Sequence, residues 1–178
     1  MCQYNNIILP DNINLDEVYK VFKMHNFRPM QVYNNSLSKQ LVDKLFLMSP
    51  KNQCDCGSVI SSARHRIIPD LKSEKEIEKI KRKGWSDTKI KNYLTSKLKA
   101  DTHKTNELET ERINWYDLIK GIFDLTKINS FGILAHEYSG DISTVLINVE
   151  SKRKIKMMEF SPQQLDSFQL DEYNEIHV

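Results

Sequence analysis

The pattern of apolar and polar positions along the chain predicts short strands separated by amphipathic helices. Apolar residues recur at helical spacing after Asn14, which can cap a helix ending near residue 25, and again over residues 105–125. The cluster Asn-Asn-Ser at 34–36 predicts a turn. Apolar runs of strand length, bounded by turn-forming residues, cover residues 6–9, 28–33, 44–48 and 131–135.

The C-terminal part of the chain predicts further β structure. Residues 143–149 and 154–160 are expected to form a hairpin, and residues 172–178 alternate as an edge strand does. Between them, Ser161 followed by Pro162 opens a short helix, since proline is tolerated at the first helical position. This order of elements predicts an α+β fold, in which a mixed, mostly antiparallel sheet has helices packed on one face.

The length of 178 residues fits a single domain over residues 1–178, with residues 72–104 inserted as a basic helical hairpin. Ser73 begins the first helix of this hairpin in a capping box, and Gly84 is placed to end it. Ser86 caps the second helix, so Trp85 lies at the bend between the two.

Composition narrows the class of protein. Hydrophobic residues make up 39% and charged residues 28%, which indicates a folded, soluble chain rather than a disordered one. No apolar run approaches the length of a membrane span, so we expect no membrane partner. The N-terminus has no basic segment followed by an apolar core, and a cytoplasmic location is therefore expected.

The net charge of +2 conceals an uneven distribution. Residues 72–104 contain eleven Lys and Arg against five Asp and Glu, a net charge of +6, whereas the remainder has 15 basic and 19 acidic residues, a net charge of −4. Such a hairpin can bind a nucleic acid or an acidic protein, and the alternative is an ordinary solvated helical face. The candidate contact residues are Lys79, Lys81, Arg82, Lys83, Trp85, Lys89, Lys91 and Tyr93.

Three cysteines form the most distinctive chemical feature of the sequence. Cys54 and Cys56 lie in the segment Gln-Cys-Asp-Cys-Gly, where a tight turn can direct both sulfur atoms at a common target, and Cys2 is the third. Thiolates in this arrangement suit a thiophilic metal, most simply zinc. A tetrahedral site needs a fourth ligand, for which His65 is the local candidate and His136, at a strand end, is the distant alternative.

Two other interpretations of the cysteines stay open. They can be buried free thiols that behave as small hydrophobic groups. They can also belong to a thiol-dependent enzyme, with Cys54 and Cys56 as a redox pair or with His136 as the base for a cysteine nucleophile. Asp55 opposes a lowered thiol pKa in that reading. The chain contains neither a glycine-rich phosphate loop nor a G-x-S-x-G nucleophile elbow.

Overall fold

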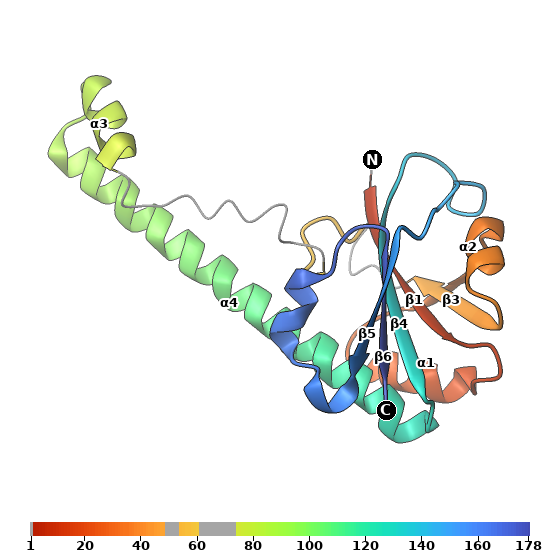
Figure 1. Ribbon diagram of the computed structural model, residues 1–178. Coiled ribbons are helices and arrows are strands. Elements are labelled where there is room, and N and C mark those ends of the chain that lie inside the picture. The colour runs from red at the N-terminus through yellow and green to blue at the C-terminus, as the bar shows by residue number, and fades with distance from the viewer. Residues whose placement is uncertain (1, 49–53, 61–73) are drawn as a thin grey trace. The chain divides into compact units, whose positions relative to one another are not determined.

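The computed structural model describes residues 2–48, 54–60 and 74–178 (Figure 1). The chain divides into two compact units, the first comprising Met1–Ala63 with Glu111–Val178 and the second comprising Arg64–Thr110. A helix of 40 residues, α4 (Asp87–Thr126), begins in the second unit and ends in the first. Among the described residues, none of the helices is both long and apolar enough to cross a membrane.

The first unit is built on a six-stranded sheet with the strand order β2-β3-β1-β4-β6-β5. Neighbouring strands are antiparallel except β5 and β6, which run parallel. The predicted α+β class with a mostly antiparallel sheet is therefore confirmed. The strands are β1 (Cys2–Pro10), β2 (Met30–Val32), β3 (Lys44–Met48), β4 (Ser130–Tyr138), β5 (Ser151–Lys156) and β6 (Glu172–His177).

Helix α1 (Leu15–Met24) and the C-terminal part of α4 pack together against one face of the sheet (Figure 1). Asn14 caps α1 as predicted, because its side chain accepts a hydrogen bond from the Asp16 backbone N–H. The ring centroids of Phe27 and Trp115 lie 4.8 Å apart in the core of this layer. The buried residues that the two helices contribute are Val18, Val21, Phe22, Trp115, Leu118, Ile119, Ile122 and Phe123.

The other face of the sheet is covered by the short helix α2 (Asn35–Gln40) and by residues 141–149. The sequence pattern predicted only a turn here. Asn34 is instead the N-cap of α2, accepting hydrogen bonds from the backbone N–H groups of Ser36 at 3.0 Å and Leu37 at 3.1 Å. The side chains of this second core include Ile8, Leu37, Leu41, Phe46, Leu134, Tyr138, Ile147 and Tyr173.

Two expectations for the C-terminal strands are wrong. Residues 143–149 form no strand, because side chains bind their backbone: Asn34 Nδ2 donates to the carbonyl oxygens of Ile142 at 2.8 Å and Val145 at 2.9 Å. β5 therefore pairs with β6 rather than with residues 143–149. The predicted edge strand at 172–178 is the interior strand β6, which lies between β4 and β5.

Two short 3-10 helices, η2 (Met157–Glu159) and η3 (Pro162–Ser167), connect β5 to β6. The helix predicted to open at Pro162 is confirmed as η3, and Ser161 and Gln164 form a capping box at its start. Arg112 of α4 is buried and holds the Asp166 carboxylate of η3 at 2.9 Å through one terminal nitrogen, which ties this connection to the helix layer.

The second unit is a helical hairpin made of α3 (Glu74–Arg82) and the first part of α4. Gly84 ends α3 with a φ of +74°, the left-handed conformation that the sequence predicted there. The sequence predicted a separate helix over residues 105–125, which is wrong, since α4 is continuous from Asp87 to Thr126. No glycine or proline interrupts residues 87–120, so helical hydrogen bonding can propagate through them. Ser73 lies outside the described residues.

We predict that Asn34→Ala destabilises the protein by about 2–4 kcal/mol, because it removes a helix cap and two buried side-chain donors. The control is Asn14→Ala, which removes an exposed cap with one hydrogen bond and should lower the free energy of unfolding by about 1 kcal/mol. Urea denaturation measures both values. Equal losses would show that the bonds from Asn34 to residues 142 and 145 contribute nothing.

Candidate metal centre

The candidate site is built where residues 54–60 lie along the first half of β1. The pairing of β3 with β1 covers Asn6 to Pro10, so it leaves the preceding residues of that edge to another partner. The Asp55 backbone N–H donates to the Gln3 carbonyl oxygen at 2.8 Å, and the Gln3 N–H donates to Cys56 Sγ at 3.2 Å. The Asn5 N–H donates to Asp55 Oδ2 at 2.8 Å. The loop thus takes the place of a neighbouring strand.

Buried side chains fasten the other end of this loop. Val59 and Ile60 are fully buried, and Gln3 Nε2 donates to the Ile60 carbonyl oxygen at 3.1 Å. Ser58 Oγ accepts a hydrogen bond from Asn5 Nδ2 at 3.3 Å and donates one to Glu111 Oε1 at 3.1 Å. The loop is therefore attached both to β1 and to α4 within the first unit.

Cys56 lies in a turn that requires glycine, and Cys54 directly precedes this turn. The Ser58 N–H donates to the Asp55 carbonyl oxygen at 2.9 Å, which closes a four-residue turn over Cys56 and Gly57. Gly57 has a φ of +86°, a conformation that side chains with a Cβ rarely adopt. The predicted thiol turn at Cys-Asp-Cys-Gly is therefore present. It carries the Asp55 carboxylate to β1 and leaves the two sulfur atoms together.

The three sulfur atoms form one cluster. Each of the Sγ atoms of Cys2, Cys54 and Cys56 lies within 4.8 Å of the other two. In a tetrahedral zinc site, metal–sulfur bonds of about 2.3 Å separate sulfur atoms by about 3.8 Å. A contraction of about 1 Å or less would therefore bring the three thiols to ligand spacing. The arrangement can supply three of the four ligands of a tetrahedral thiophilic metal.

The cluster is open to solvent. Cys2 and Cys56 are exposed and Cys54 is partly exposed, so the reading as buried hydrophobic cysteines does not fit the structure. Tyr4 lies beside the thiols: burial, followed by the nearby Cys2 and Cys54, raises the pKa of its hydroxyl group. An exposed cluster of this kind leaves access for a further ligand.

The structure describes only one of the two histidines that the sequence offers as a fourth ligand. His65 lies outside the described residues. His136, which pairs with Tyr4 across β1 and β4, is not among the donors within 4.8 Å of the cluster. Its Nδ1 lies 2.5 Å from Asp171 Oδ1, and its ring packs edge-on against Tyr138 with centroids 4.8 Å apart. A carboxylate on Nδ1 is the arrangement that commonly orients a metal-binding imidazole, with Nε2 as the ligand atom.

Sequence reasoning overlooked the residues that position the sulfur atoms. Gln3 and Asn5 are buried polar side chains in β1, and Asp55, treated only as a charge near the thiols, is a structural acceptor. One signal was present in the sequence. Two polar residues alternate at the start of an apolar strand, directly after a cysteine, which indicates that this end of the strand needs polar partners.

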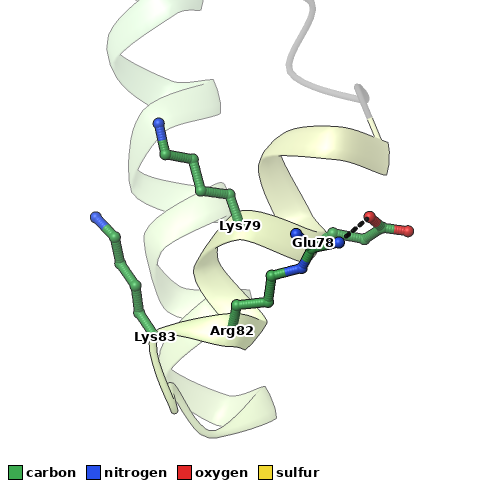
Figure 2. Close-up of a pocket in the computed structure, with 4 residues that line it drawn as sticks. All are labelled: Glu78, Lys79, Arg82 and Lys83. Carbon is green, nitrogen blue, oxygen red and sulfur yellow. Dashed lines mark ion pairs between the residues drawn. The ribbon is translucent and has the colours of Figure 1, made fainter.

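The residues predicted to bind an acidic partner lie in the second unit. The six lysine and arginine side chains named from the sequence are exposed on α3, on the turn that follows it and at the start of α4, whereas Trp85 and Tyr93 are partly buried. Figure 2 shows three of these cations, Lys79, Arg82 and Lys83, lining a surface pocket with Glu78.

The chain matches no known family model, no curated protein and no solved structure.

We predict that Asp55→Ala lowers the free energy of unfolding by about 1–3 kcal/mol, because it removes the acceptor for a buried backbone N–H of β1. Asp55→Asn is the matched control, since it keeps a side-chain oxygen at that position and should lose less. Urea denaturation measures the free energy of unfolding. The alkylation rate of Cys56 reports whether the loop stays attached to β1. If both variants were as stable as the wild-type protein, the Asp55 carboxylate would not help to hold the loop on β1.

Proposed function

We propose that this protein binds a thiophilic metal ion, with zinc as the expected ion, through Cys2, Cys54 and Cys56. The observation that carries the proposal is the clustering of all three cysteines of the chain within 4.8 Å of one another. Thiolate sulfur favours Zn²⁺, Cu⁺ and iron–sulfur chemistry over Mg²⁺ or Ca²⁺. Three sulfur donors without a described histidine neighbour suit one metal ion with a further position to fill.

The hydrogen bonds around the cluster support metal binding. The Gln3 N–H that donates to Cys56 Sγ would stabilise negative charge on that sulfur, whether as a thiolate or as a metal ligand. Three of the hydrogen bonds that attach the loop to β1 involve no sulfur atom, so they would position the ligands before a metal binds. The entropy lost on metal binding is correspondingly small.

The fourth ligand decides between a structural and a chemically active ion. His65 or His136 would close the coordination shell and give a structural site, which joins the start of β1 to residues 54–60. A water molecule in that position would leave the ion open to exchange and able to act as a Lewis acid. Exposure of Cys2 and Cys56 favours the open form.

We expect metal analysis of the untagged protein to find about one zinc ion per chain. Cys54→Ser and Cys56→Ser should each weaken zinc binding by more than about 100-fold, because each removes a ligand. Zinc at 100 times its Kd should raise the free energy of unfolding by about 2.7 kcal/mol, and a chelator should reverse this. The matched control is Ser58→Ala, at the last position of the turn, which perturbs the loop but removes no sulfur.

Two outcomes would contradict the proposal. One is zinc affinity that survives in the Cys54→Ser/Cys56→Ser double variant. The other is a metal-free protein that takes up neither zinc nor copper(I) while one thiol alkylates much faster than a free cysteine. That second result would indicate the thiol-dependent enzyme instead.

Cobalt(II) substitution identifies the fourth ligand, because its d–d spectrum reports the number and type of donors. If His136 is the ligand, His136→Gln should change the spectrum and weaken binding, and His65→Gln should leave both unchanged. The opposite pattern would assign His65. An unchanged spectrum in both variants would support water as the fourth ligand. Asp171→Asn should weaken binding only in the first case, by about 10–100-fold.

A further inference from the structure

The second unit carries a concentrated positive charge that the metal site does not use. Within residues 79–99 there are eight lysine and arginine residues and one acidic residue, Asp87. The glutamates that dilute the charge of α3 all precede this segment. Five of the eight cations lie within five residues of Gly84, so the positive charge is densest at the bend of the hairpin.

Apolar packing inside the hairpin directs these cations outward. Ile90 is buried, and Ile80 and Leu94 are partly buried, which marks the inner side of the two helices. Lys79 and Lys83 are exposed one helical turn apart and extend toward the same side of α3 (Figure 2). Arg82 extends instead toward Glu78, with which it forms an exposed ion pair at 3.6 Å.

The aromatic residues at the bend position a cation rather than offering a free surface. Lys89 Nζ lies 4.2 Å from the centroid of the Trp85 ring, a cation–π contact. Tyr93 packs edge-on against the same ring, with centroids 5.7 Å apart. One side of Trp85 is thus occupied by Lys89, so stacking of an unpaired base there would have to displace that lysine. This arrangement favours contacts to phosphate over stacking on bases.

We propose that the bend of the α3–α4 hairpin binds the phosphate backbone of a duplex nucleic acid without reading its sequence. Lysine and arginine that neutralise phosphates supply most of such binding, which needs no contact to base edges. Seven of the eight cations are lysines. Lysine is depleted at protein–protein interfaces, where arginine is enriched, and this favours a nucleic acid over an acidic protein.

The test measures binding of the full-length protein to a fluorescently labelled 20-base-pair duplex by anisotropy, over a range of salt concentrations. We expect log K to fall linearly with log salt, with a slope of about −3 if three or four phosphates are neutralised. Lys79→Glu/Lys83→Glu should weaken binding at least about tenfold and make the slope shallower. Trp85 fluorescence, recorded in a Trp115→Phe background, should change on binding.

The control is Lys20→Glu/Lys120→Glu, which changes the net charge equally on exposed lysines of the first unit. It should reduce affinity far less than the hairpin variant, and circular dichroism shows that both variants keep their helices. If both variants lost the same amount of affinity for the duplex, net charge alone would explain the effect and the proposal would be overturned. Absence of binding at low salt would also overturn it, as would tighter binding to a polyglutamate peptide than to the duplex.

Discussion

The hydrogen bonds between β1 and residues 54–60 determine where the cysteine cluster of the first unit lies. An interior strand must satisfy its backbone N–H groups on both sides, and the pairing with β3 extends only as far as Asn6. Asp55 and Cys56 supply the acceptors for the Asn5 and Gln3 N–H groups that come before it. Because Cys2 is the first residue of the same strand, this docking also brings its sulfur to the other two.

Within the four residues of the turn around Cys56, one side chain binds the backbone of β1 and the cysteine sulfur stays available at the surface. Asp55 is buried and serves the backbone, while the flanking sulfur atoms stay at the surface. A carboxylate turned toward β1 does not take up a position among the sulfur donors, so the cluster keeps its soft character. Soft donors at an accessible position define the class of ion that the proposed site would take.

The two proposed sites, one in each unit, would rely on different kinds of recognition. In the first unit, buried hydrogen bonds hold the loop that carries two of the sulfur atoms, so selectivity for a metal would come from geometry and donor softness. In the second unit, cations project from a two-helix support, and selectivity would come from charge density and its screening by salt. Separate substitutions can therefore remove either property without touching the residues of the other.

The sequence by itself determined the elements with strong local signals. Asn14 and Gly84 mark a helix start and a helix end through their own side-chain and backbone preferences, and the run at 44–48 is a strand as predicted. The α+β class followed from the order of such elements. The choice of the three cysteines as candidate ligands also needed only their rarity and spacing.

Tertiary structure decided what depends on distant partners. Residues 143–149 have the composition of a strand, but Asn34 and Gln40 bind their backbone groups, so they cover the sheet instead of joining it. Residues 172–178 became interior because β5 pairs with them in parallel, which no local pattern encodes. Cys2 and Cys54 are more than fifty positions apart in the sequence, and no local preference brings them together. They meet because the loop that carries Cys54 closes onto β1 and satisfies its backbone hydrogen-bonding groups.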